Sequence, residues 1–294
     1  MKGGKYTVEI THPNKILFPK GKISKEELAL YYLKVAKLML PLIQGRPISM
    51  HRFPNGINKI GFFQKRSPET IPKWMQTVQV KREAKGSIPM ILCQEKGTLL
   101  WLANQNCITP HIWLSKIDKP NFPDRMIFDL DPPTKKEFPL AVEGALILKE
   151  ILEKAKLKAF VMTTGSKGLH VVVPIQRKFS FEQVRAAARR IAEQVVFKDP
   201  KKFTLKIQKS QRRGRVYIDV LRNGFAQTTV APYAIRALPN APVAVPLFWK
   251  ELGDKNLRSD LYTLRTIGSR LRKNPWKGLY TNDFKNWEYA KEAP

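Results

Sequence analysis

Acidic residues are few in this sequence, with 24 aspartates and glutamates against 53 lysines and arginines and a formal net charge of +29. Cysteine is scarcer still, because only Cys93 and Cys107 are present. A disulfide framework is therefore excluded, and a reducing compartment is expected. No apolar run reaches the ~20 residues of a membrane span, and the N-terminus lacks the apolar core of a signal peptide. We expect a cytoplasmic protein without a membrane partner.

The excess of positive charge favours a polyanionic partner, and nucleic acid is the first candidate. A generic cationic surface is the alternative. An acidic membrane surface is a weaker candidate, because lysine and arginine are spread along the chain and no single basic amphipathic helix collects them. The hydrophobic content of 43% over 294 residues is enough for a large core in one domain or two.

Apolar residues at helical spacing predict four helices. Two of these helices open with a capping box, formed by Ser24 with Glu27 and by Ser180 with Gln183. In the second helix the buried stripe is expected to be Ala141, Ala145, Leu148, Ile151, Leu152 and Ala155. The predicted helices cover residues 25–40, 139–155, 180–197 and 257–272.

Runs rich in β-branched and other apolar residues predict five strands after residue 125. These runs are Met126 to Asp131, Ala159 to Thr163, Leu169 to Pro174, Phe203 to Ile207 and Val216 to Leu221. With the helices between them, they give the order strand, helix, strand, strand, helix, strand of a split βαβ fold, which is ferredoxin-like. The fold class expected is therefore α+β. The first and third strands should be neighbours, and Val216 to Leu221 competes with Phe203 to Ile207 for the other side of the first.

Asp129 and Asp131 lie one residue apart at the end of the first of these strands. Side chains alternate along a strand, so both carboxylates should project from one face while Phe128 and Leu130 face the other. Two like charges so placed repel unless a cation lies between them. If Val216 to Leu221 flanks this strand, Asp219 joins the pair. Three carboxylates on one face suit a two-metal site for phosphoryl or nucleotidyl transfer. In the alternative interpretation, Asp129 and Asp131 only cap the Pro-Pro turn that follows them.

Two further motifs can contact a nucleotide or a nucleic acid. The segment Thr163-Thr164-Gly165-Ser166-Lys167-Gly168-Leu169-His170 combines two glycines, hydroxyls and a lysine, and so predicts a turn that cradles phosphate, although an ordinary hairpin has the same chemistry. In Phe62-Phe63, aromatic rings adjoin basic residues and suit base stacking. Because neighbours on a strand point to opposite faces, we expect at least one of these rings in the core.

Taken together, these motifs resemble the polymerase domain of bacterial ligase D, a member of the archaeo-eukaryotic primase superfamily. The similarity rests on the Asp-Leu-Asp strand, the Gly-Ser-Lys-Gly-Leu-His turn and the segment from Gly214 to Asn223. It extends from Asn14-Lys15-Ile16-Leu17-Phe18-Pro19 to Thr229-Val230-Ala231-Pro232-Tyr233-Ala234-Ile235-Arg236 and beyond. It implies a single primase-polymerase domain over residues 1–294, with an N-terminal α/β subdomain (1–120) that contacts DNA ends and a catalytic subdomain (121–294).

The resemblance also implies residue roles. The metal ligands and catalytic residues are Asp129, Asp131 and Asp219, which hold two Mn²⁺ or Mg²⁺ ions. The nucleotide is bound by Thr164, Ser166, Lys167, Gly168, His170 and Arg236, with Arg52 and His111 near it. The 5′-phosphate of DNA is bound by Lys15 and Lys25, and the template stacks on Phe62 and Phe63. The family usually has serine at the position of Thr164, which keeps the hydroxyl.

The implied activity is template-directed addition of nucleotides, ribonucleotides preferentially but also deoxyribonucleotides, to DNA ends and gaps with a 5′-phosphate during non-homologous end joining. The sequence lacks the Lys-x-Asp-Gly nucleotidylation motif of a ligase; the nearest match, Lys116-Ile117-Asp118-Lys119, has no glycine. A stand-alone polymerase module or an excised domain is therefore expected, with a separate DNA ligase and a Ku-like end-binding protein as partners in the nucleoid.

Two other functions fit parts of the sequence. A haloacid-dehalogenase-type phosphatase also has an apolar strand that ends in Asp-x-Asp, with the first aspartate as nucleophile. Its further acidic residues are not matched well, because Gly253-Asp254 lies in a predicted loop. A non-catalytic DNA-end binding module would need only the charge. Nucleotide affinity that depends on manganese distinguishes the polymerase from such a module.

Overall fold

The computed structural model describes residues 1–81 and 86–279. The described residues form two compact units, one within residues 1–118, 228–244 and 262–273 and the other within residues 119–227, 245–261 and 274–279. The chain passes from the first unit to the second close to residue 120, and it returns to the first unit twice later. Within the described ranges, no helix combines the length and the apolar character that crossing a membrane requires.

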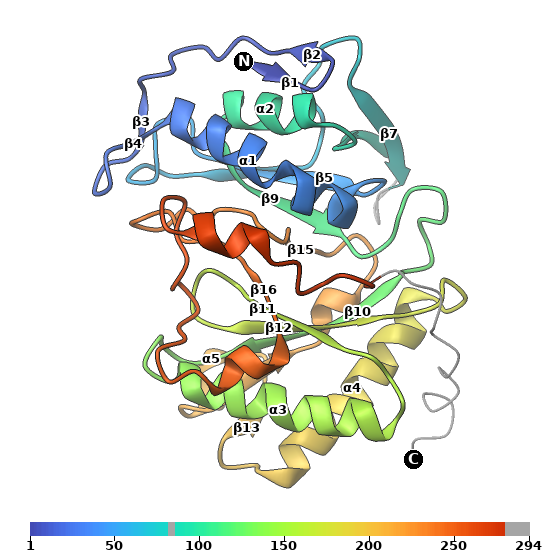
Figure 1. Cartoon of the computed structure of the whole chain (residues 1–294). Coiled ribbons are helices and arrows are strands. Elements are labelled where there is room, and N and C mark those ends of the chain that lie inside the picture. Colours follow the sequence, from blue (N-terminus) through green and yellow to red (C-terminus); the bar gives the residue numbers. More distant parts are fainter. Residues whose placement is uncertain (82–85, 280–294) are drawn as a thin grey trace. The chain divides into compact units, whose positions relative to one another are not determined.

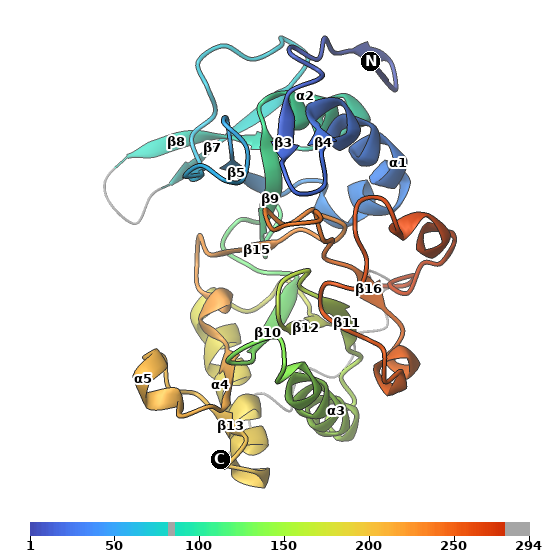
Figure 2. The ribbon, with the colours of Figure 1, turned by 90° about the vertical axis from the view of Figure 1, so that its left-hand side faces the viewer.

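The first unit contains a sheet with the strand order β15-β9-β5-β8-β7, in which β6 also pairs with β5. Figure 2 shows α1 and α2 on one side of these strands. The elements are β1 (Lys2–Gly3), β2 (Tyr6–Thr7), β3 (Ile16–Phe18), β4 (Ile23–Ser24), α1 (Lys25–Ile43), β5 (Pro47–Arg52), β6 (Phe62–Gln64), β7 (Gln76–Lys81), β8 (Ser87–Leu92), α2 (Lys96–Asn104), β9 (Cys107–Trp113), β15 (Thr228–Val230) and the 3₁₀ helix η3 (Ile267–Arg272).

The second unit is a six-stranded sheet with the order β13-β14-β10-β12-β11-β16, and α3 and α4 cover one of its faces (Figure 1). Its elements are β10 (Arg125–Asp131), α3 (Phe138–Lys154), β11 (Phe160–Thr163), β12 (Leu169–Pro174), α4 (Phe181–Lys198), β13 (Phe203–Thr204), α5 (Lys209–Arg212), β14 (Val216–Asp219), η1 (Leu221–Asn223), β16 (Pro246–Leu247) and η2 (Trp249–Gly253).

Local sequence signals account for the helices that surround the sheets. Both predicted capping boxes are present. The Ser24 and Ser180 side chains accept from the backbone N–H groups of Glu27 and Gln183, respectively. The side chains of Glu27 and Gln183 accept in turn from the backbone N–H groups of the two serines. The six residues of the predicted stripe of α3 are all buried. Amphipathic spacing and capping are thus sufficient to locate α1, α3 and α4 within a few residues.

The order of the strands resolves the competition for the place beside β10. The strand β14 pairs antiparallel with one edge of β10 and β12 with the other, as the split βαβ order predicts. The strand β13 is only two residues long and lies outside β14, to which it is parallel. The segment beginning at Phe203 is therefore an edge strand, and β10 lies between two strands that carry polar residues.

The predicted helix over residues 257–272 is wrong, because only the 3₁₀ helix η3 forms there. Side chains and backbone in this segment are engaged elsewhere. The Ser259 hydroxyl donates to the Gly168 carbonyl oxygen over 2.9 Å, and Thr263 forms a bridge with Pro242. The N–H of Thr263 donates to the Thr266 hydroxyl over 2.9 Å. Bonds of this kind compete with helical hydrogen bonds, so apolar periodicity alone was misleading.

Candidate active site and nucleic-acid contacts

Strand pairing brings two of the predicted acidic ligands to opposite positions. In the antiparallel register Asp129 on β10 lies directly opposite Asp219 on β14 and opposite His170 on β12. Asp131 follows two residues later on β10, after the fully buried Leu130. Because side chains two residues apart share a face of the sheet, the three carboxylates are carried by one region of the second unit.

Asp219 is in an environment that disfavours its charge. Burial raises the pKa of the Asp219 carboxyl above its ordinary value, and repulsion by Asp129 raises it further. Three contacts oppose these effects: the Arg222 Nε at 3.4 Å, the N–H of Leu221, which donates over 2.8 Å, and the Tyr217 hydroxyl, which donates over 3.3 Å. Burial and the neighbouring acid together outweigh these three contacts, so a further positive charge beside Asp219 would stabilise its ionised form.

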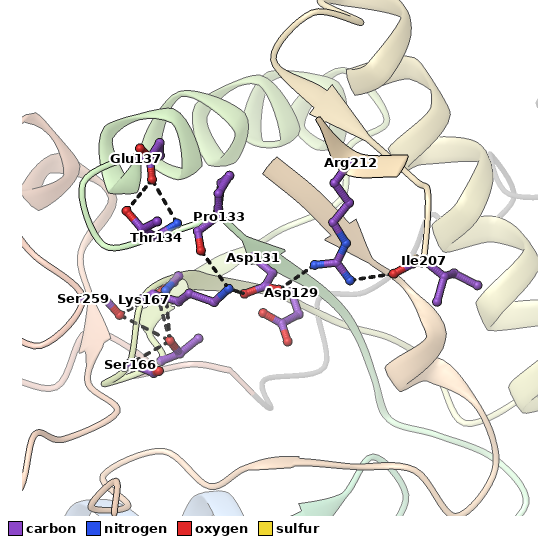
Figure 3. Close-up of polar contacts among 12 residues, drawn as sticks. Asp129, Asp131, Pro133, Thr134, Glu137, Ser166, Lys167, Ile207, Arg212 and Ser259 are labelled. Carbon is purple, nitrogen blue, oxygen red and sulfur yellow. Dashed lines mark hydrogen bonds and ion pairs between the residues drawn. The ribbon is translucent and has the colours of Figure 1, made fainter. Parts of the chain in front are cut away.

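Asp131 is held by two cationic side chains, as Figure 3 shows. Its Oδ1 atom lies 2.9 Å from the Lys167 Nζ, and its Oδ2 accepts from the Arg212 Nη1 over 2.9 Å. Arg212 is fixed in turn, because its guanidinium stacks over the Tyr217 ring at 4.1 Å and donates to the Ile207 carbonyl oxygen over 2.9 Å. A cation that binds Asp131 must therefore compete with Lys167 and Arg212.

Arg212 was not predicted as a site residue. It lies in the basic segment Gln208–Arg215, and basic residues are so frequent in this chain that one more carries little information. Its neighbour Tyr217, two residues before Asp219 on the same strand, was also missed. The alternation that selects Asp129 and Asp131 would have selected Tyr217 and Asp219 together.

The glycine-rich turn is organised by Thr164. The N–H of Thr164 donates to the Gly168 carbonyl oxygen over 3.0 Å, and Gly165 adopts a φ of +68°, which favours glycine. The buried Thr164 hydroxyl accepts from the N–H of Gly168 over 3.2 Å and from that of Ser166 over 3.4 Å. This hydroxyl is used inside the turn, whereas Ser166 and Lys167 are only half-buried.

Gly168 and His170 connect this turn to the acidic residues. A side chain on Gly168 would overlap the Leu130 carbonyl oxygen, so only glycine permits the close approach of the turn to β10. His170 is buried, with its Nε2 atom 3.5 Å from the Asp129 Oδ1. The turn, the histidine and the acids are consequently one group of residues within the second unit.

A second group of predicted residues lies on the first unit. His111 on β9 lies opposite Ser49 on β5, and its ring is 5.2 Å from that of Phe63. Phe63 is stacked on His51 with the ring centroids 4.2 Å apart. Burial lowers the pKa of His51, and the positive charge of Arg236 lowers it further. His51 was not predicted, although it stands next to Arg52 in the sequence.

The expectation that one of the two adjacent phenylalanines lies in the core is wrong. Phe62 is 46% exposed and Phe63 is 56% exposed. Both residues lie on β6, which pairs only with the outer part of β5 near Arg52, and the Arg52 guanidinium lies 5.5 Å from the Phe62 ring centroid. Each ring has a neighbour on one side, His51 for Phe63 and Arg52 for Phe62. About half of each residue is still exposed, which leaves room for stacking with a base.

Lys15 and Lys25 lie next to each other at the start of α1. The N–H of Lys25 donates to the Lys15 carbonyl oxygen over 2.8 Å, and the buried Lys25 Nζ donates to the Thr11 carbonyl oxygen over 2.8 Å. The pKa of Lys25 is lowered by burial and then by the charges of Lys15 and Arg52. Cations are unfavourable at the N-terminus of a helix, so an anion beside the two lysines would be stabilising. Such an anion must compete for the Lys25 ammonium with the oxygens of Thr11 and Asn104.

The predicted site residues thus form two groups, each joined by strand pairing or side-chain contacts. The second unit carries Asp129, Asp131, Asp219, Thr164, Ser166, Lys167, Gly168 and His170, and the first unit carries Lys15, Lys25, Arg52, Phe62, Phe63, His111 and Arg236.

Comparisons with known proteins identify the family. Residues 24–276 match the model of the LigD primase-polymerase domain. The chain is 33% identical over 253 residues to the multifunctional non-homologous end joining protein LigD of Mycolicibacterium smegmatis. This match covers 85% of this chain and 33% of that protein. The chain is also 31% identical over 278 residues to the bifunctional non-homologous end joining protein LigD of Bacillus subtilis. That match covers 94% of this chain and 44% of the relative.

A solved structure agrees with these matches. The polymerase domain of ligase D from Mycobacterium tuberculosis, solved in complex with DNA, is 28% identical and superposes with a TM-score of 0.86 over 98% of this chain and 99% of that one. The mixed α+β fold is therefore that of a polymerase domain. The chain spans between a third and a half of the length of the two curated relatives. It belongs to the LigD primase-polymerase domain family.

Proposed function

We propose that this chain is a template-directed polymerase that extends 3′ ends and fills short gaps in DNA during non-homologous end joining. Members of the family are nucleotidyltransferases, and the names of the curated relatives place those proteins in end joining. The observation that carries the proposal is the register of β10 and β14, in which Asp129 faces Asp219. A group of acidic residues in a chain with a net charge of +29 suits catalysis on a bound polyanion.

Asp129, Asp131 and Asp219 are the residues that would hold the metal that the family implies. Carboxylate oxygens are the ligands that Mg²⁺ and Mn²⁺ prefer, and the raised pKa of Asp219 favours a cation at this place. In the arrangement that residues 1–81 and 86–279 adopt, no three acidic, histidine or cysteine side chains are grouped closely enough for one ion. Asp131 is turned to Lys167 and Arg212 instead, and it must leave them to join the other two acids.

Two bound ions would lower the pKa of the primer hydroxyl and stabilise the leaving pyrophosphate. The residues of the chain provide the remaining functions. The half-buried Ser166 and Lys167 bind the triphosphate together with His170, whose Nε2 atom also lies 3.5 Å from the Asp129 Oδ1. Arg236 helps to neutralise the triphosphate, and Arg52 and His111 lie near the nucleotide. Ribonucleotides are preferred to deoxyribonucleotides. When the ion pair between Lys167 and Asp131 opens, the Lys167 ammonium becomes available to phosphate and the Asp131 carboxylate becomes available to a metal ion.

Metal-dependent nucleotide binding tests this proposal. We expect a ribonucleoside triphosphate to bind at least about tenfold more tightly with Mn²⁺ than with EDTA, because the acids otherwise repel the phosphates. Isothermal titration calorimetry of the whole chain measures both affinities. Asp129→Asn should remove the difference, whereas Asp254→Asn, in an exposed turn, should keep it. Equal affinities with and without Mn²⁺ in the wild-type protein would support a non-catalytic DNA-binding module.

Lys15 and Lys25 are proposed to bind the 5′-phosphate on the far side of a gap, while Phe62 and Phe63 stack against the template. The two lysines lie together without an acidic partner in any described ion pair, and the burial of Lys25 makes an anion there favourable. A separate DNA ligase and a Ku-like end-binding protein would complete the repair reaction.

The phosphate assignment predicts the behaviour of a double variant. Lys15→Ala combined with Lys25→Ala should abolish the preference for a gapped duplex that carries a 5′-phosphate, which two lysine contacts would set at about tenfold or more. Primer extension on gaps with and without the phosphate measures the preference. Lys20→Ala combined with Lys22→Ala removes the same charge nearby and should retain it. A double Lys15/Lys25 variant that still prefers the phosphate places the phosphate site elsewhere.

The phosphatase interpretation has no support from the comparisons, since the family model that covers residues 24–276 is that of a primase-polymerase domain.

A further inference from the structure

Tyr233 has a backbone conformation that side chains of its size rarely adopt. Its φ is +67°, in the left-handed region, and the residue is buried, with 1% of its surface exposed. A bulky residue in this region is strained, and strained residues persist only where their surroundings fix them. Such residues concentrate at functional sites, so the contacts that fix Tyr233 indicate what the strain maintains.

Two buried hydroxyl groups hold the backbone around Tyr233. The Tyr31 hydroxyl, from α1, donates to the Tyr233 carbonyl oxygen over 2.7 Å. The Thr109 hydroxyl, from β9, donates to the Ile235 carbonyl oxygen over 2.6 Å. The N–H of Tyr233 also donates to the Ala244 carbonyl oxygen over 2.7 Å. The segment is therefore held by α1 and β9, which are distant in sequence, and by the following segment at Ala244.

Arg236 directly follows this fixed segment. Its N–H donates to the Pro242 carbonyl oxygen over 2.7 Å, two residues before the Ala244 carbonyl that accepts from Tyr233. Arg236 lies close enough to His51 to lower the pKa of that histidine, and His51 is directly opposite Thr109 in the sheet. The hydroxyl groups, the strained residue and the arginine are thus parts of one arrangement within the first unit.

Packing alone does not explain the hydroxyl of Tyr31. A phenylalanine would fill the same space in the core, and burial of a phenol without need is costly unless its hydrogen bond is required. The same holds for Thr109, which valine would replace with little change in shape. The two hydroxyl groups act on carbonyl groups of the strained segment, and loss of either allows that segment to relax toward a less strained conformation.

We propose that Tyr31 and Thr109 are positioning residues, whose hydroxyl groups hold the strained backbone of residues 233–235 so that Arg236 is kept ready to bind the triphosphate of the nucleotide. The inference rests on the proposed function, in which Arg236 neutralises that triphosphate. It adds that the affinity for nucleotide is controlled from helix α1 and strand β9, by residues that do not touch the nucleotide.

Steady-state primer extension by the whole chain tests this role. We expect Tyr31→Phe and Thr109→Val each to raise KM for the nucleotide about five- to tenfold, which is the effect of losing one buried hydrogen bond, and to change kcat by less than about threefold. Val35→Ala is the control, since Val35 is buried one turn further along the same helix. It should lower the melting temperature without raising KM.

A double-mutant cycle separates positioning from a general loss of structure. In an Arg236→Ala background, Tyr31→Phe should add no further increase in KM, because the arginine that it positions is gone. Independent, multiplicative effects of the two substitutions would overturn the inference, as would a Tyr31→Phe variant with an unchanged KM beside an Arg236→Ala variant with a raised one. An Arg236→Ala variant with an unchanged KM would instead refute the nucleotide-binding role of Arg236 in the proposed function, and the inference with it.

Discussion

Replacement of Asp129 by alanine is expected to reduce primer extension by about a thousandfold or more. Metal ions supply several kcal/mol of stabilisation to the transition state, and each ~1.4 kcal/mol corresponds to a factor of ten in rate. Asp129 faces both Asp219 and His170 in the sheet, so its loss removes the central ligand of the group. Extension of a labelled primer on a gapped duplex, with Mn²⁺ present, measures the effect.

DNA binding should be nearly unchanged in the Asp129→Ala variant, because removing an acid does not weaken the contacts that lysine and arginine make with phosphates. Fluorescence anisotropy with a labelled gapped duplex provides this control. Asp254→Ala, in an exposed turn of the same unit, should extend the primer at the wild-type rate. Wild-type extension by Asp129→Ala would show that the metal ligands have been assigned wrongly.

Replacement of Gly168 by alanine is expected to have the largest effect on the structure of the site. The added methyl group would overlap the Leu130 carbonyl oxygen and crowd the Pro132 ring, and backbone atoms cannot move aside as a flexible side chain can. Overpacking of this kind costs about 1–3 kcal/mol or more, which corresponds to a fall in melting temperature of roughly 3–10 °C for a domain of this size.

Activity should fall further than stability in the Gly168→Ala variant. The overlap displaces β10 between Asp129 and Asp131, and a displacement of the catalytic groups by about 1 Å can cost a hundredfold in rate. Thermal denaturation and primer extension measure the two effects. Gly253→Ala is the matched control, because no atom lies within 4 Å of the position of its added methyl group. Normal melting and normal extension by Gly168→Ala would contradict the close approach of the turn to β10.

Several features were predictable because neighbouring residues specify them. Capping boxes located the starts of α1 and α4, and the apolar stripe located α3. Alternation along β10 identified Asp129 and Asp131 as residues of one face, and the spacing of glycines identified the turn that ends at Gly168. The helix expected over residues 257–272 failed because hydrogen bonds to distant residues, such as that from Ser259, compete with local periodicity.

Local patterns in the amino-acid sequence were enough to identify the available chemistry: few acids in a basic chain, a pair of them on a strand, a turn that suits phosphate and motifs that resemble a family of polymerases. The folded chain was needed to show that Asp219 faces Asp129, that Arg212 and Lys167 hold Asp131, and that Phe62 and Phe63 are both exposed. Local propensities act over a few residues, whereas strand register, ion pairs and burial depend on which distant segments meet.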